Sequence, residues 1–228
     1  MTADLMSPPA SRRPLSRPLS GLELALGAAI VIGHNVFRVL PNEVPILFVL
    51  ALVSTRLREG GWAALGFRRP RRWWVVIALA LGATLLRLVL ADLVVEPLAA
   101  HVWRPVAAPK LASGIPGHPM AALSALAMIW TFAAFGEEIG YRGYLTKRAS
   151  DILGGGRAAW IVGVAVSAAL FGIGHWYKGP AGVLGSAVAG LILGGAYLLS
   201  GRCLWTTILA HGLIDTTGLV LLYFGLAD

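Results

Sequence analysis

Charged residues are scarce in this chain. Asp, Glu, Lys and Arg make up 13% of its 228 residues, whereas 57% of the residues are hydrophobic. Soluble domains carry roughly 25% charged residues, so this composition argues against a water-soluble protein. Apolar runs long enough to cross a lipid bilayer recur along the chain. The sequence therefore predicts an all-α, polytopic bundle of transmembrane helices.

Cysteine is also nearly absent, since Cys203 is the only one. A single cysteine excludes an intrachain disulfide, and we expect Cys203 to pack as a small apolar residue. The formal net charge is +8, but the basic residues lie in short segments between apolar runs. Such a distribution is typical of signals that orient membrane proteins and contact anionic lipid. It indicates a lipid bilayer, and no nucleic acid, as the partner.

Seven apolar segments predict seven spans, or eight if the connector Glu96–Pro119 hides another one. The segments are 21–39, 42–55, 73–95, 119–144, 158–177, 180–200 and 203–225. The connector contains several prolines and has room for a short interfacial or re-entrant helix. Residues 1–20 are basic and rich in Pro and Ser, so we expect a disordered tail before a bundle that spans residues 21–228.

The basic residues orient these seven spans. Fourteen fall on one side, namely Arg12, Arg13, Arg17, Arg56, Arg58, Arg68, Arg69, Arg71, Arg72, Arg142, Lys147, Arg148, Arg157 and Arg202. Four fall on the other, namely Arg38, Arg104, Lys110 and Lys178, and Arg87 lies inside a span. The positive-inside rule then predicts a cytoplasmic N-terminus and an external C-terminus. We expect a multi-pass protein of a bacterial cytoplasmic membrane.

Small residues at four-residue spacing mark two helix faces. Ser186, Gly190 and Gly194 share a face of the sixth predicted span, and Gly136 and Gly140 share a face of the fourth. Small side chains let helices approach closely in lipid. We interpret both faces as packing surfaces.

Three polar clusters interrupt the later spans, at Glu137–Arg142, Phe171–His175 and His211–Asp215. A charged residue at the centre of a membrane helix costs about 2.5–3.5 kcal/mol on the insertion scale. Such groups usually face the bundle interior or a wet cavity, and they usually serve function. The clusters therefore predict an active site inside the bilayer.

Helical geometry separates the two adjacent glutamates. Glu138 and Arg142 are four residues apart and share a face, so they can form an ion pair. Glu137 lies about 100° further around an α-helix and has no partner in its own helix. An unpaired carboxylate in such a place is a candidate general base. The same four-residue spacing puts His211 and Asp215 on one face.

Some of these residues also have a structural explanation. Pairs such as Glu138–Arg142 are common inside membranes and are more often structural than catalytic. A lone His can simply form a hydrogen bond between helices. Two His, a spare Glu and an Asp on three separate spans are harder to explain in this way, and they indicate function.

Other polar residues in the spans are weaker candidates. We expect His34, Asn35, Arg87 and Asp92 to form interhelical hydrogen bonds or to lie at the interface. Glu23 lies near the start of the first predicted span, where an acidic residue suits the helix N-terminus.

The three motifs, in this order on late spans, resemble those of the CPBP family. That family comprises the CAAX-processing endopeptidases and bacterial relatives linked to bacteriocin processing and self-immunity. Here the motifs are Glu137-Glu138 with Arg142, Phe171 with His175, and His211 with Asp215. The resemblance covers about residues 119–225, with a weaker echo in Gly61–Phe67. It implies an intramembrane endopeptidase that cuts a membrane-anchored protein or peptide.

The resemblance also implies roles for individual residues. Glu137 and His175 would activate a water molecule, while His211 and Asp215 would stabilise the oxyanion. Asp215 stands where the best-known members have Asn, and an ionised Asp cannot donate a hydrogen bond to an oxyanion. Asp215 is therefore protonated, or orients His211, or helps to hold a metal. Glu138, Arg142 and Phe171 would support the site.

Two questions remain open from the sequence. Glu137, His175, His211 and Asp215 would make a chemically sensible zinc site, but a Glu–His pair can activate water alone, so we favour a reaction with no required cofactor. The predicted spans also put Glu137 and His175 at different depths. They can meet only if Gly154–Gly156 dips into the bilayer or the span boundaries are shifted.

Two other function classes compete with the peptidase. A small transporter could use the buried groups as a proton relay, but the chain lacks the repeated halves typical of transporters. A catalytically silent scaffold or self-immunity protein could retain the same fold. The intact pair of Glu137 and His175 argues against the silent protein.

Overall fold

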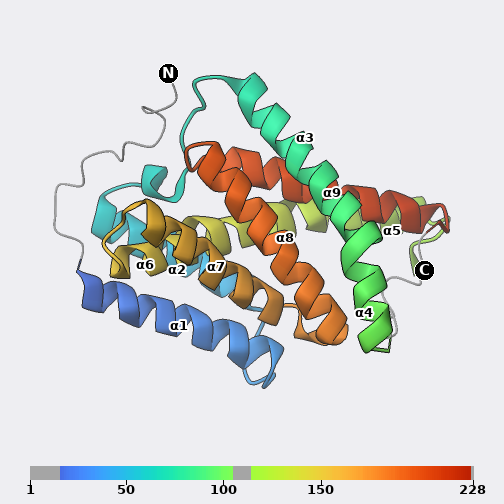
Figure 1. Ribbon diagram of the computed structural model, residues 1–228, viewed down its shortest axis with the longest axis horizontal. Helices are drawn as coiled ribbons and strands as arrows, with labels where there is room; N and C mark the ends of the chain where they lie inside the picture. Colours follow the sequence, from blue (N-terminus) through green and yellow to red (C-terminus); the bar gives the residue numbers. More distant parts are fainter. Residues whose placement is uncertain (1–15, 105–113, 227–228) are drawn as a thin grey trace.

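The computed structural model describes residues 16–104 and 114–226, which form helices and turns and no strand (Figure 1). The first helix, α1 (Arg17–Asn35), begins inside the segment predicted as a disordered tail. Its start is fixed by Ser16, whose side chain accepts a hydrogen bond from the backbone N–H of Leu19. The tail prediction for residues 1–15 lies outside the described residues.

The helices follow one another as seven rods. They are α1; α2 (Glu43–Glu59); α3 (Trp73–Leu90), continued by the π-helical turn Ala91–Val95 and α4 (Glu96–Val102); α5 (Pro119–Met128), continued by the π-helix η5 (Ile129–Leu145) and α6 (Thr146–Ile152); α7 (Arg157–Ile173); α8 (Gly179–Leu199), preceded by the short turn η6 (Trp176–Lys178); and α9 (Leu204–Tyr223). A 3-10 turn, η2 (Trp62–Leu65), follows α2.

Four of these rods are long and apolar enough to cross a membrane, at Trp73–Val102, Pro119–Ile152, Trp176–Leu199 and Leu204–Tyr223, and α7 is a shorter apolar helix. The helical membrane bundle is thus confirmed for the described residues. Seven spans remain a prediction, because α1 and α2 are not among these candidates. The start of the long connector is corrected, since residues 96–102 extend the third rod.

The fourth rod is longer than the sequence predicts. It runs from Pro119 to Ile152 instead of ending near residue 144. Hydropathy places its end too early because Lys147, Arg148 and Asp151 look like a solvated connector. In the structure all three are buried, and the positive groups are paired with acids.

This buried charge cluster ties α6 to α1 and α2. Lys147 donates to Asp151 over 2.8 Å, and Arg148 donates to Glu59 over 2.7 Å. Arg148 also forms an ion pair with Glu23. The role expected for Glu23, stabilising a helix N-terminus, is therefore incomplete, because its main partners are arginines of other segments.

Helix α7 runs antiparallel to the second half of the long rod. A Cβ atom on Gly163 would lie 2.6 Å from the carbonyl oxygen of Thr146. Further along, the hydroxyl of Ser167 donates to the carbonyl oxygen of Tyr141 over 2.8 Å. In Figure 1, α8 (orange) crosses in front of α9 (red), with α7 on one side and α3 on the other.

The predicted small-residue faces are packing surfaces. A Cβ atom on Gly190 would lie 2.8 Å from the Cα atom of Ala168 in α7. On the long rod, a Cβ atom on Gly136 would lie 2.8 Å from the side chain of Val44 in α2. These helices approach so closely that larger side chains would not fit without movement.

Candidate active site

The carboxylate of Glu137 faces a cavity of about 170 Å³ that also holds His175. Its buried Oε2 atom has no hydrogen-bond partner in the part of the chain that the structure describes. Tyr141 and Tyr177 also line this cavity. The unpartnered carboxylate expected from the sequence is therefore present, and it lies in the same cavity as the histidine of the second motif.

The close approach of α7 to the long rod brings these two residues together. A Cβ atom on Gly174 would lie 2.7 Å from the Tyr141 hydroxyl, so the end of α7 contacts a side chain of the π-helix that also carries Glu137. The expected difference in depth between Glu137 and His175 disappears because the fourth rod extends to Ile152. Shifted boundaries, and not a re-entrant glycine segment, resolve the conflict.

Glu137 and Glu138 lie in a π-helix, where the sequence predicts an α-helix. A π-helix forms i→i+5 backbone hydrogen bonds, and short π-helical segments are frequent at functional sites. The residue spacing still allows the expected pair, since Arg142 donates to Glu138 over 2.8 Å. Both side chains are buried, with 0% and 2% exposure for Glu138 and Arg142.

His175 is held in a defined ring orientation. Its Nδ1 atom lies 2.8 Å from the carbonyl oxygen of Phe171. A carbonyl oxygen can only accept, so Nδ1 carries the proton and Nε2 of the neutral ring is an acceptor. This Nε2 atom is the one available for a water molecule or a substrate.

His211 lies between two carboxylates. Its Nδ1 atom is 2.7 Å from Oε1 of Glu138, and its Nε2 atom is 3.5 Å from Oδ2 of Asp215. Of the three roles that the sequence leaves open for Asp215, this geometry favours the orientation of His211. Neither His211 nor Asp215 lines the cavity that holds Glu137.

Phe171 connects the three motifs. Its ring centre is 4.7 Å from that of His175 and 5.9 Å from that of His211. The guanidinium of Arg142 lies 4.2 Å from the ring centre, a cation–π distance. The phenyl ring therefore lies next to both histidines and the buried arginine.

Residues at the turn between α1 and α2 also contribute to the cavity, and the sequence does not predict their position there. His34, Asn35, Asn42 and Glu43 line it. A sequence signal exists, because these four polar residues lie within ten positions between two apolar segments. They look like an ordinary loop, and only the fold brings them near Glu137.

Glu137, His175, His211 and Asp215, the possible zinc ligands in the sequence, do not form a metal site as they are placed. Within residues 16–104 and 114–226, no group of three or more His, Cys, Asp or Glu side chains could hold a metal ion. Three of the four histidine ring nitrogens already have partners in the chain: both nitrogens of His211 face carboxylates, and Nδ1 of His175 faces a carbonyl oxygen. We therefore derive no reaction step through a metal.

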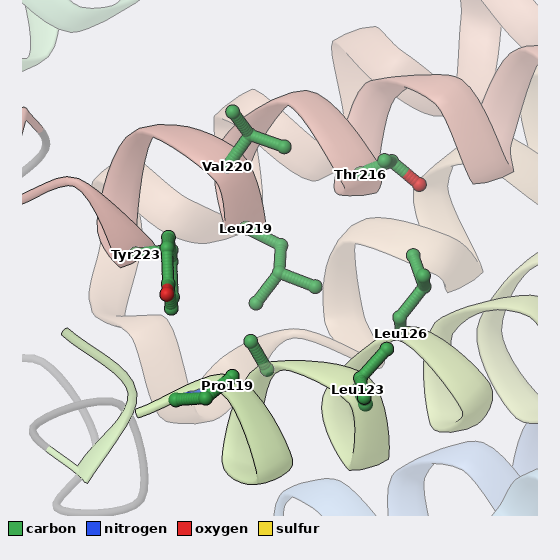
Figure 2. Close-up of a pocket in the computed structure, with 8 residues that line it drawn as sticks. Pro119, Leu123, Leu126, Thr216, Leu219, Val220 and Tyr223 are labelled. Carbon is green, nitrogen blue, oxygen red and sulfur yellow. The ribbon is translucent and has the colours of Figure 1, made fainter. Parts of the chain in front are cut away.

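A larger groove, of about 310 Å³, lies between α5 and α9 (Figure 2). Its lining is Pro119, Ala122, Leu123, Leu126, Thr216, Leu219, Val220 and Tyr223. Figure 2 shows the side chains of Leu126 and Leu219 between the two helices. The lining contains no carboxylate and no histidine, so this groove cannot supply the chemistry of hydrolysis.

The comparison with protein families agrees with the motifs. Residues 119–217 match the family model described as Type II CAAX prenyl endopeptidase Rce1-like. No curated protein and no solved structure matches the chain. The matched segment contains all three motifs, from Glu137 to Asp215. The match agrees with the resemblance that these residues indicate, over the segment of the chain that carries the motifs.

Proposed function

We propose that this protein is an intramembrane endopeptidase that hydrolyses a peptide bond in a membrane-associated substrate, with water activated by Glu137 and His175. The observation that carries the proposal is the position of Glu137. Its unpartnered carboxylate shares one cavity with an imidazole whose free nitrogen is an acceptor. A general base and a second polar group near the same water molecule are what peptide hydrolysis requires.

The chemical step balances with these residues alone. Glu137 takes a proton from water while the oxygen of that water attacks the carbonyl carbon of the substrate. The new C–O bond gives a tetrahedral intermediate, and the C–N bond then breaks. The proton held by Glu137 passes to the leaving nitrogen, so that one water molecule is consumed and an acid and an amine are formed. His175 positions the water through Nε2.

The oxyanion of the intermediate needs donors, and His211 is the proposed one. The carboxylates of Glu138 and Asp215 stabilise the protonated ring of His211, which then has two N–H groups. Movement of Asp215 away from Nε2 would free one of these donors for the oxyanion. Asp215 is 34% exposed at its side chain, so it has space for that movement.

A peptidase assay tests this function. The purified full-length protein is reconstituted in phosphatidylcholine vesicles and incubated with a library of membrane-anchored peptides, and products are identified by mass spectrometry. We expect cleavage at one bond type without added metal. Intact peptides under all conditions, together with movement of a solute across the vesicle membrane, would instead support a transporter.

A further inference from the structure

The cavity at Glu137 has a second polar group of residues, from the turn between α1 and α2, which the proposed reaction does not use. Among them, Glu43 is an acid with only 7% of its surface exposed. It lines the cavity together with Glu137. A carboxylate in this place requires a partner, because a buried and unpaired charge is costly.

The two asparagines of the turn are explained by local structure. Asn35 donates its amide N–H to the carbonyl oxygen of Val31 over 3.1 Å. Asn42 caps α2 by accepting from the backbone N–H of Val44 over 2.9 Å. Both contacts are typical of helix ends. Of the four polar residues of the turn that line the cavity, only His34 and Glu43 have side chains that can carry a charge.

His34 is a poor partner for Glu43 when its ring is neutral. Its Nδ1 atom lies 3.0 Å from the carbonyl oxygen of Leu40, so Nδ1 carries the proton. Nε2 lies 3.4 Å from Oε2 of Glu43 and is then an acceptor that faces another acceptor. In that tautomer His34 donates no hydrogen bond to Glu43, and within residues 16–104 and 114–226 the carboxylate has no other side-chain partner, so a cation from outside the chain could bind it.

The remaining lining also suits a cation. A cavity of about 170 Å³ has room for about five or six water molecules at roughly 30 Å³ each. Glu43 and Glu137 both line this cavity, so a positive group that enters it would face two carboxylates. The aromatic residues of the cavity are Tyr141 and Tyr177, and the ammonium of Lys178 already lies 5.7 Å from the centre of the Tyr177 ring.

We propose that Glu43 determines specificity, by binding the positively charged side chain of a Lys or Arg that flanks the scissile bond of the substrate. This inference rests on the proposed peptidase function. Glu43 also lies in the first turn of α2, where an acid stabilises the helix N-terminus. An exposed carboxylate would stabilise the N-terminus of α2 equally well. This stabilisation therefore does not explain why the carboxylate is buried in the wall of the reaction cavity.

Matched peptides test the inference in the wild-type protein. Three series of membrane-anchored peptides carry Lys, Gln or Glu at each position around the cleavage site and are otherwise identical. Hydrogen bonds to a charged group correspond to about 10- to 100-fold in a binding equilibrium. We expect kcat/KM to be about 10- to 100-fold higher for Lys than for Gln at one flanking position.

Variants assign this preference to Glu43. Glu43→Gln should reduce the Lys-to-Gln ratio to about one, and Glu43→Lys should favour the Glu peptide. Glu23→Gln is the matched control, because its side chain is similarly buried, with 12% exposure against 9% for Glu43, but pairs with arginines away from the cavity. It should keep the wild-type ratio even if it lowers stability.

The possible failures are distinguishable. Equal cleavage of the Lys, Gln and Glu peptides by the wild type would overturn the role of Glu43 and leave the peptidase intact. An unchanged ratio in folded Glu43→Gln would overturn it as well. No cleavage of any peptide would overturn the peptidase function itself. The wild-type ratio needs no variant, so the inference can be refuted even if a substitution at Glu43 prevents folding.

Discussion

Oε1 of Glu138 lies 2.7 Å from Nδ1 of His211 and 2.8 Å from Nη1 of Arg142. One carboxylate oxygen therefore joins the first motif of the sequence to the third. The spacing of the residues predicts the bond to Arg142, which lies one turn away. The bond to His211 connects two different rods, because His211 lies 73 positions after Glu138 in the sequence.

Breaking this junction should destabilise the fold. Arg142 is buried, and removing one partner of a buried ion pair typically costs about 3–5 kcal/mol. We therefore expect Arg142→Ala and Glu138→Gln to lower the amount of folded protein and its thermal stability in detergent. A stable Arg142→Ala protein with full activity would show that the pair is not needed for folding.

The contact between α7 and α8 should tolerate no added methyl group at Gly190. A Cβ atom there would lie 2.8 Å from the backbone of Ala168, so the two helices must separate. Overpacking of this kind costs about 1–3 kcal/mol. Gly190→Ala should lower the melting temperature in detergent.

Gly195 supplies the control for this substitution, because it lies in the same helix and a Cβ atom there would contact nothing within 4 Å. Gly195→Ala should be neutral or stabilising, since Ala favours a helix over Gly by up to about 1 kcal/mol. Equal effects at both positions would mean that helix propensity, and not close packing, controls stability here.

The charge cluster at the end of α2 should make stability depend on pH. Burial tends to raise the pKa of Glu59, but the hydrogen bond and the charges of Arg148 and Lys147 outweigh burial, so the pKa is lowered. A lowered pKa in the folded state contributes stability that is present above the unfolded-state pKa, about 4.3, and is lost as the pH falls through the folded-state value. The melting temperature should therefore fall below about pH 4.3.

Replacement of Glu59 isolates this effect. Glu59→Gln should melt at a lower temperature than the wild type at pH 7, and the difference should shrink as the pH approaches 3. Glu96→Gln is the control, because Glu96 is exposed on α4. A wild-type protein and a Glu59→Gln variant with parallel pH profiles would be inconsistent with this account.

Much of the fold could be predicted from apolar patterning, because each rod buries one face and shows the other to lipid. The end of the fourth rod could not. Lys147 and Arg148 pair with the nearby Asp151 and also with Glu59 and Glu23, which lie far away in the sequence, and an average of hydropathy cannot register such distant pairing. The same error shifted the predicted depth of Glu137.

The candidate site also contains some contacts that the sequence predicts and others that it does not. The i,i+4 spacings predict the contacts of Glu138 with Arg142 and of His211 with Asp215, and both are present. The bond from His211 to Glu138 and the contribution of Glu43 to the cavity depend on helix packing, which spacing along one helix does not specify.

Orientation in the membrane is a separate prediction. Arg142, Lys147 and Arg148 lie in the long rod and not in a connector, but without them the basic residues still divide 11 to 4. The positive-inside rule then keeps the Arg56–Arg72 segment in the cytoplasm. A reporter fused after Arg72 should behave as cytoplasmic, and a reporter that is active only outside the membrane would reverse the proposed topology.

The most direct test of the central claim is the turnover of Glu137→Gln. Removal of a general base usually slows a reaction by about 100- to 10,000-fold, and the amide is nearly isosteric with the carboxylate. We expect Glu137→Gln to fold and melt like the wild type while its kcat for a cleaved membrane peptide falls by at least about 100-fold. A folded Glu137→Gln protein that cleaves the peptide as fast as the wild type would contradict the account.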